Sequence, residues 1–270
     1  MSKTILISGA SKGFGKAWTE AFLEKGYNVA ATARNIDTLA DLKAKYGDAI
    51  LPLTLDVNNR EDSFAAVKKV QEHFGKIDIL INNAGYALNG AVEEASEKEA
   101  RAQFETNFFG TLWLTQAVLP IMRNQKRGHI IQVSSILGIA TLPNLGLYNA
   151  SKFAVEGLTE TLSQEVKQFG INVTLVEPNG YVTDIWGNGF NSEPIDAYDG
   201  IKKAIAEQEN ADSFGKTSAT VPAIIKLAEA ENPPLRLFLG KVALPFAKQT
   251  YEQKLATWEE WADVSVAAHG

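Results

Sequence analysis

The sequence predicts a single α/β domain built on a doubly wound parallel sheet of about seven strands. Short β-branched runs alternate with longer amphipathic stretches along most of the chain. Runs such as residues 77–81 and 171–176 are almost continuously apolar, which is typical of strands that are buried on both faces of a sheet. A length of 270 residues fits one large domain of this class.

The expected strands follow one another along the chain, and helices fill most of the gaps between them. They lie near residues 4–8, 28–32, 50–55, 77–81, 129–133, 172–176 and 235–239. Residues 1–270 are expected to form one domain, because the sequence contains no internal repeat, low-complexity tract or linker.

Two segments are less regular than the rest. Residues 179–213 are rich in Gly, Asn, Asp and Ser, and are expected to form a flexible substrate loop. Residues 241–270 are expected to form a C-terminal helical extension with an apolar stripe. The stripe consists of Phe246, Tyr251, Leu255, Trp258 and Trp261. Packing of this stripe against the core is the favoured interpretation, and contact with a second subunit is the alternative.

The composition excludes several classes of function. A net charge of −6 without a basic cluster argues against a nucleic-acid partner. The absence of cysteine excludes disulfides and thiolate sites, and His73, His129 and His269 lack metal-ligand spacing, so no metal is expected. There is no secretory leader and no apolar run of about 18 residues, so a cytoplasmic protein without a membrane partner is expected.

A glycine-rich turn follows the first expected strand. Gly9, Gly13 and Gly15 have GxxxGxG spacing, and a helix begins near Phe14. Glycines at such a turn let backbone N–H groups approach a pyrophosphate at the positive end of the helix. The motif alone is weak, because any tight strand-to-helix turn favours glycine.

Further motifs follow in a specific order. The fourth expected strand ends in Asn82-Asn83-Ala84-Gly85, and Ser135 ends the fifth. Tyr148 and Lys152 are four residues apart, so a helix places them on one face. A lone Tyr-x-x-x-Lys pair is common by chance, but this ordered set is not.

With these motifs, residues 3–240 resemble the classical short-chain dehydrogenase/reductase family. The resemblance implies a Rossmann-like sheet and a catalytic tetrad of Asn107, Ser135, Tyr148 and Lys152. Ser134 is the alternative serine, but the thirteen-residue spacing to Tyr148 favours Ser135. The glycine turn would hold the cofactor phosphates, and the Asn-Asn-Ala-Gly segment would support its adenosine side.

The resemblance also implies which residues bind the cofactor. They are Gly9, Ser11, Lys12, Gly13, Phe14, Gly15, Arg34, Asp56, Val57, Asn83, Ala84, Gly85, Tyr148, Lys152, Pro178, Gly180, Val182 and Thr183. Pro178 and Thr183 match the family's PGxxxT segment, in which the threonine touches the nicotinamide carboxamide. Asn179 departs from the usual glycine there, although asparagine tolerates left-handed backbone angles.

The tetrad suits the chemistry of carbonyl reduction. A carbonyl that receives hydride needs a proton, and a phenol with a pKa near ~10 releases one slowly at neutral pH. Lys152 is expected to lower the pKa of Tyr148 and, by resemblance, to hold the nicotinamide ribose. Ser135 can donate to the carbonyl oxygen, while Asn107 fixes a relay water. The expected substrate-binding residues are Ser135, Leu137, Leu142, Leu145, Tyr148, Tyr181, Trp186 and Phe190.

NADP(H) is the expected cofactor. The second strand ends near Ala33, which offers no carboxylate to a ribose 2′-hydroxyl. Arg34 follows it and, with Lys12, can bind a 2′-phosphate.

The predicted function is NADP(H)-dependent interconversion of a neutral, largely apolar ketone or aldehyde and its alcohol. Residues 178–200 carry Asp184, Glu193, Asp196 and Asp199 but no lysine or arginine to bind a phosphate-bearing substrate. A non-catalytic NADP sensor and an epimerase or lyase of a related nucleotide-binding family are the alternatives. A homodimer or homotetramer is expected, because apolar residues surround much of the helix within residues 97–127. The resemblance implies that this helix and the one after Tyr148 pack across a two-fold axis.

Overall fold

The computed structural model describes residues 2–183, 190–208 and 214–269. Its main sheet has seven parallel strands in the order β3-β2-β1-β4-β5-β6-β9. The strands are β1 Thr4–Ile7, β2 Asn28–Ala33, β3 Ile50–Thr54, β4 Ile79–Asn82, β5 Gly128–Val133, β6 Ile171–Pro178 and β9 Arg236–Leu239. Each overlaps its predicted range, so the predicted doubly wound parallel sheet is confirmed.

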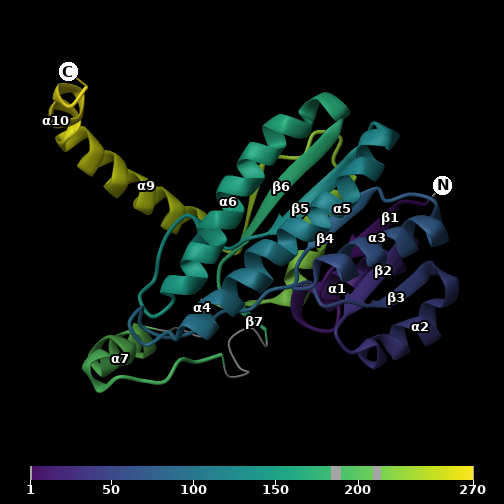
Figure 1. Cartoon of the computed structure of the whole chain (residues 1–270), viewed down its shortest axis with the longest axis horizontal. Coiled ribbons are helices and arrows are strands. Elements are labelled where there is room, and N and C mark those ends of the chain that lie inside the picture. Colours follow the sequence, from purple (N-terminus) through teal and green to yellow (C-terminus); the bar gives the residue numbers. More distant parts are fainter. Residues whose placement is uncertain (1, 184–189, 209–213, 270) are drawn as a thin grey trace.

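The helices cover both faces of this sheet. They are α1 Gly13–Glu24, α2 Ala40–Tyr46, α3 Arg60–Phe74, α4 Glu97–Phe104, α5 Gly110–Gln125, α6 Gly146–Val166, α7 Asp199–Gln208, α8 Val221–Glu229, α9 Ala243–Glu260 and α10 Ala262–Ala267. One apolar cluster joins a sheet face to α1, α2 and α8, and a second joins the other face to α3, α5 and α6 (Figure 1).

Alternation along a single strand explains why both clusters form. In β1 the side chains of Ile5 and Ile7 belong to the first cluster, and that of Leu6 belongs to the second. All three are fully buried. Successive side chains of a strand point to opposite faces, so the continuous apolar runs in the sequence supply both cores at once.

The strand order reverses beside β1, which lies between β2 and β4. In an open α/β sheet, ligands bind at such a switch point, beyond the carboxyl ends of the strands. The turn after β1, the segment after β4 and the loop after β5 all leave the sheet at this edge. The sequence motifs are therefore brought to one end of the molecule.

The predicted substrate-loop segment, residues 179–213, contains β7 Tyr181–Val182 and helix α7, and β7 pairs with β8 Gly215–Lys216 just beyond the segment. At the C-terminus, α9 and α10 extend away from the body (Figure 1). The expectation that the apolar stripe of this segment packs on the core is wrong for most of it. Phe246 packs against a body cluster, but Tyr251, Leu255, Trp258 and Trp261 are exposed. Within the described ranges, no helix combines the length and apolarity needed to cross a bilayer.

Candidate active site

The turn between β1 and α1 requires glycine, because its backbone has positive φ angles and passes very close to neighbouring backbone atoms. Gly9 and Gly13 have positive φ values of 69° and 56°. A Cβ at Gly15 would collide with the carbonyl oxygen of Gly9 and lie 2.6 Å from Asn83 Nδ2. The first turn of α1 thus packs directly on the preceding loop, with its N-terminus at the carboxyl edge of the sheet, where backbone N–H groups favour an anion.

The segment after β4 braces this turn. Asn83 Nδ2 donates to the carbonyl oxygens of Ser8 and Gly9, both at 3.0 Å. The backbone N–H groups of Asn83 and Ala84 donate to Ser8 Oγ, also at 3.0 Å. The Asn83 side chain therefore shapes the glycine loop, which gives the Asn-Asn-Ala-Gly motif a structural role at the predicted cofactor site.

The segment after β6 also lies beside the glycine turn. A Cβ at Gly13 would lie 3.7 Å from Thr183 Cγ2, so this threonine flanks the glycine turn. Asn179, which replaces the family's glycine, does not have a left-handed backbone. Its side chain instead occupies space beside Gly240, where φ is +98° and a Cβ would collide with the amide. The asparagine at position 179, where the family has glycine, is therefore accommodated by Gly240, which directly follows β9 and leaves room for the amide.

The expected 2′-phosphate residues lie at this edge too. The Ala10 N–H donates to the carbonyl oxygen of Thr32 at 2.8 Å, which ties the glycine turn to the end of β2. Lys12 and Arg34 both have exposed side chains close to that link. Of the remaining predicted cofactor residues, Asp56 is exposed after β3 and Val57 is buried against Gly110. The glycine turn fits the pyrophosphate of a dinucleotide, and Lys12 and Arg34 add positive charge beside it.

Asn107 lies in a π-helical turn, Glu105–Phe109, that joins α4 to α5. Such turns are often found at functional sites. The Asn107 side chain is 1% exposed; its Nδ2 donates to the Tyr86 carbonyl oxygen and to Ser151 Oγ, each at 3.0 Å, and its Oδ1 accepts from the Tyr86 N–H at 3.1 Å. A Cβ at Gly85 would lie 3.1 Å from Asn107 Oδ1 and 3.8 Å from Lys152 Nζ, so both side chains lie close to Gly85.

The structure brings Ser135, Tyr148 and Lys152 together at the start of α6. Ser135 caps a short 3₁₀ turn through its Oγ, which accepts from the Leu137 N–H at 3.1 Å, and it hydrogen-bonds the Tyr148 side chain. Lys152 Nζ donates to the carbonyl oxygen of Val133 at 2.8 Å and lies 5.7 Å from the centre of the Tyr148 ring. The alternative serine, Ser134, is buried beside Gly138 and Glu156 instead.

Burial dominates the titration of the Tyr–Lys pair. It raises the pKa of Tyr148 to about 12, against a hydrogen bond from Ser135 that lowers it. Burial also lowers the pKa of Lys152 to about 8, against the charge of Glu156 that raises it. The expected decrease in the pKa of Tyr148 is not seen, because desolvation by burial is the largest influence on the phenol and raises its pKa.

A buried carboxyl pair lies behind Lys152. Glu156 follows it by one turn of α6, Glu177 lies in β6, and the two carboxyl groups lie close enough for each to shift the pKa of the other. Arg236 contacts Glu156, Glu177 and Glu160 at 3.2, 3.3 and 3.0 Å. Burial, followed by the charge of Glu156, raises the pKa of Glu177 to about 9. The pair therefore shares one proton at neutral pH.

This proton makes a pH-dependent contribution to stability. The folded-state pKa of Glu177 is raised, so the folded protein binds one proton more than the unfolded chain between about pH 5 and pH 9, and stability falls as the pH rises through that window. The expected slope is at most about 1.4 kcal/mol per pH unit. Glu177→Gln should flatten the decline, as measured by urea unfolding at pH 6 and pH 8. Equal slopes in the parent and the variant would contradict the shared proton, and Glu165→Gln, a surface change in α6, is the matched control.

The predicted substrate residues separate into groups. Leu137 and Leu145 are buried in one cluster with Tyr148. Tyr181 instead packs edge-on against Phe14, at 5.0 Å between ring centres. Leu142 is half-exposed on the outer side of α6, and Phe190 lies 4.2 Å from the ring of Tyr86. Trp186, like Asp184, lies outside the described residues.

The segment around α7 is fastened to the loop after β4. Backbone hydrogen bonds join Asn89 to Phe190 and to Ser192, at 2.8 and 2.9 Å. The Glu94 carboxylate accepts from the Ile195 N–H at 2.7 Å and pairs with Lys202. Among the described residues, Lys202 is the only lysine near the start of α7 that contacts this loop. Its ammonium group is paired with the Glu94 carboxylate.

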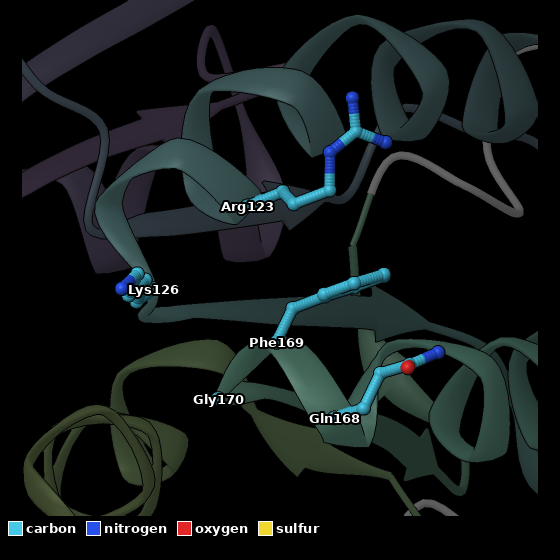
Figure 2. A pocket seen from close by; sticks show the side chains of 5 residues that line it. All are labelled: Arg123, Lys126, Gln168, Phe169 and Gly170. Carbon is cyan, nitrogen blue, oxygen red and sulfur yellow. The ribbon is translucent and has the colours of Figure 1, made fainter.

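Figure 2 shows a hollow at the opposite edge of the sheet, where α5 ends and β6 begins. It is lined by Arg123, Lys126, Gln168, Phe169 and Gly170. The Arg123 guanidinium lies 6.0 Å from the centre of the Phe169 ring. None of the predicted site residues lines it, so the tetrad and this hollow belong to different ends of the molecule.

Sequence reasoning missed several residues that hold the site. Tyr86 and Ser151 orient Asn107, and Glu156 and Glu177 lie behind Lys152. A glutamate inside the apolar run of β6 was the available signal for Glu177, since an acid within a buried strand needs a partner. Its partners, Glu156 on α6 and Arg236 on β9, are distant in sequence, and no sequence pattern points to them.

Comparisons with known proteins agree on the kind of molecule. A family model described as short chain dehydrogenase matches residues 3–193. Oxidoreductase BOA17 of Botryotinia fuckeliana is 39% identical over 273 residues, covering 99% of this chain and 100% of that protein. A 3-ketodihydrosphingosine reductase of Bacteroides thetaiotaomicron is 38% identical over 252 residues, 90% of each chain. A crystal structure of a short-chain dehydrogenase from Streptomyces avermitilis aligns with a TM-score of 0.90 and 36% identity, over 99% of both chains.

Proposed function

This chain belongs to the short-chain dehydrogenase family, and on that premise we propose that it is an NADP(H)-dependent carbonyl reductase. Family membership makes it an oxidoreductase that uses a nicotinamide cofactor. The finer proposal is that it reduces a neutral, largely apolar ketone or aldehyde to an alcohol, or catalyses the reverse reaction. The observation that carries it is the convergence of Ser135, Tyr148 and Lys152 at the carboxyl edge of the sheet, next to the glycine turn.

The proposed roles follow from the contacts. When bound, NADPH supplies the hydride for the carbonyl carbon. Ser135 donates a hydrogen bond to the carbonyl oxygen, where negative charge develops. Tyr148 gives that oxygen its proton, and its high pKa keeps the proton on the phenol before the reaction. Lys152 and Asn107 both lie close to Gly85, and their proposed role is to return a proton from solvent through a water.

The surroundings of the tetrad favour a neutral substrate. Leu137, Leu145 and Tyr148 form one apolar cluster. Arg236, the cation nearest the carboxyl pair, contacts three carboxylates and lies behind Lys152 rather than over the site. Glu94 engages Lys202. A phosphate-bearing substrate usually meets basic side chains, and these two are already paired. The name of the Bacteroides relative, 3-ketodihydrosphingosine reductase, is that of a ketone reductase.

A substrate screen tests this proposal directly. NADPH oxidation, followed by absorbance, should be faster with uncharged aliphatic and aromatic ketones than with acyl coenzyme A thioesters or sugar phosphates. The physical reason is that moving an unpaired charged group from water into an apolar site costs several kcal/mol even after the protein relaxes around it. Faster turnover of an acyl coenzyme A than of every neutral ketone would refute the substrate class. Turnover of no carbonyl compound or alcohol with either cofactor would refute the proposed function itself.

A further inference from the structure

The carboxyl group of Glu156 lies one helical turn beyond Lys152, on the same face of α6. Both side chains are buried, and each residue is 6% exposed. A buried charge is stable in a fold only when another group compensates it. None of the roles proposed for the tetrad involves Glu156, so its place directly behind Lys152 requires an explanation of its own.

Arg236, the first residue of β9, holds this carboxyl group. Its Nη2 lies 3.2 Å from Glu156 Oε2 and 3.0 Å from Glu160 Oε2, and its Nε lies 3.3 Å from Glu177 Oε1. A guanidinium group is planar and always charged, so it binds these oxygens in a fixed geometry. Glu160 is exposed, and the buried contacts of Arg236 are therefore those with Glu156 and Glu177.

The 3₁₀ turn after β5, Ile136–Gly138, closes the other side of Glu156. A Cβ at Gly138 would lie 2.8 Å from Glu156 Cγ and also 2.8 Å from Ser134 Oγ. The Glu156 side chain is therefore confined between this turn and Arg236. Burial raises the pKa of Glu156, and Ser134 and Arg236 oppose this increase.

Glu156, rather than Glu177, carries the negative charge of the buried pair at neutral pH. Burial, followed by the charge of Glu156, raises the pKa of Glu177 to about 9. Glu177 therefore holds the shared proton, and Glu156 stays ionised beside Arg236. Burial lowers the pKa of Lys152 to about 8, and the charge of Glu156 opposes this decrease.

Apart from the carboxyl pair and its arginine, the groups described next to Lys152 are uncharged at neutral pH. On α6, burial raises the pKa of Tyr148 to about 12, so the phenol keeps its proton. Strand β5 supplies the carbonyl oxygen of Val133, which accepts from Lys152 Nζ at 2.8 Å. The Asn107 amide and the backbone at Gly85 are also neutral. The anion that favours the ammonium form of Lys152 is thus the carboxylate behind it.

We propose that Glu156 is a positioning residue that keeps Lys152 in its charged form, and that Arg236 keeps Glu156 ionised. The inference rests on the proposed function, in which Lys152 returns a proton from solvent to Tyr148. A neutral amine is a far weaker acid than an ammonium group, so it would return this proton poorly. Loss of the carboxylate therefore lowers turnover at neutral pH, although Glu156 lies behind Lys152 and outside the reacting groups.

Nuclear magnetic resonance of the full chain with isotope-labelled lysine tests this without substrate or cofactor. The Lys152 signal is the one that is lost in Lys152→Met. In the parent it should titrate near pH 8, well below the ordinary lysine pKa of ~10.4. In Glu156→Gln, the midpoint should fall by roughly one pH unit or more, because the nearby opposite charge is gone.

Glu177→Gln is the matched control, because it removes the carboxyl of the same buried pair that holds the proton and not the charge. It should leave the Lys152 midpoint unchanged. Glu156→Asp keeps the charge, so its midpoint should lie above that of Glu156→Gln. Glu156→Met is a second neutral variant, which preserves the test if circular dichroism shows that Glu156→Gln does not fold. Equal midpoints in the parent and the neutral variants would overturn the proposal, and so would a fall of the same size in Glu177→Gln.

The pH profile of turnover gives a second readout. In Glu156→Gln, the alkaline limb of kcat for NADPH-dependent ketone reduction should move to lower pH by the same amount as the Lys152 midpoint. The rate above the parent midpoint should fall by up to about ten-fold for each unit of this shift, and it should recover at lower pH. A rate lowered equally at every pH would show a purely structural effect and would overturn the proposal. If no carbonyl compound is reduced, the proposed function fails, and the lysine titration still decides whether Glu156 keeps Lys152 charged.

Discussion

Replacing Tyr148 with phenylalanine is expected to abolish turnover while NADPH binding stays close to that of the parent enzyme. The substitution removes only the hydroxyl that hydrogen-bonds Ser135 and keeps the ring packed in its buried cluster. A positioned general acid contributes about 10²–10⁴-fold to rate, so the loss in kcat should fall in that range. The measurements are kcat with the best neutral ketone and the Kd of NADPH from fluorescence titration.

Two further variants make this result specific. Tyr27→Phe removes a hydroxyl that bonds Glu229 at the opposite edge of the sheet, and it should keep the parent rate. Lys152→Ala should lower both kcat and NADPH affinity, because its ammonium group lies near the Tyr148 ring and, by the family resemblance, is expected to hold the nicotinamide ribose. A Tyr148→Phe enzyme that retains more than about a tenth of the parent rate has lost under ~1.4 kcal/mol of barrier reduction, and the acid/base assignment would then be wrong.

Much of the fold could be predicted because β strands buried on both faces have an unmistakable pattern. In β1, Ile5, Leu6 and Ile7 supply two cores, so the sequence there is apolar without interruption. Strand ends were less certain. The fourth strand was expected at residues 77–81 but is Ile79–Asn82, because Ile77 pairs its backbone with Gln125 of α5 instead of a neighbouring strand.

The residue types of the candidate site could be predicted from the sequence, but the contacts that orient its side chains could not. The motif order predicted that Ser135, Tyr148 and Lys152 lie together, and the structure groups them at the start of α6. The π-helical turn that orients Asn107 depends on contacts with Tyr86 and Ser151, which the periodicity of the sequence does not reveal. The C-terminal extension, residues 241–270, likewise shows what periodicity cannot predict. Helical spacing correctly gave an apolar face around Trp258, but periodicity does not say which surface covers that face.

Cofactor choice is expected to favour NADPH over NADH by roughly ten- to several-hundred-fold in kcat/KM. Arg34 follows the last residue of β2, and Lys12 lies in the glycine turn that is tied to that strand through Ala10 and Thr32. Two opposite charges about 4 Å apart attract by about 4 kcal/mol at an effective dielectric near 20 and by about 1 kcal/mol in bulk water, and a partly exposed contact lies between these values. An arginine adds two parallel hydrogen bonds to a phosphate.

The test compares both cofactors in the parent, in Arg34→Ala and in an Ala33→Asp, Arg34→Ala double variant. Ala33 is 4% exposed and packs in the first core cluster, so a carboxylate there costs folding stability as well as repelling a 2′-phosphate. Arg34→Ala alone avoids that cost, because its side chain is exposed, and it should raise the KM for NADPH while leaving that for NADH unchanged. Arg127→Ala, an exposed arginine at the amino edge of the sheet, should change neither. If the parent enzyme already prefers NADH, or if the Arg34→Ala variant keeps the full NADPH preference, then Arg34 does not recognise the 2′-phosphate.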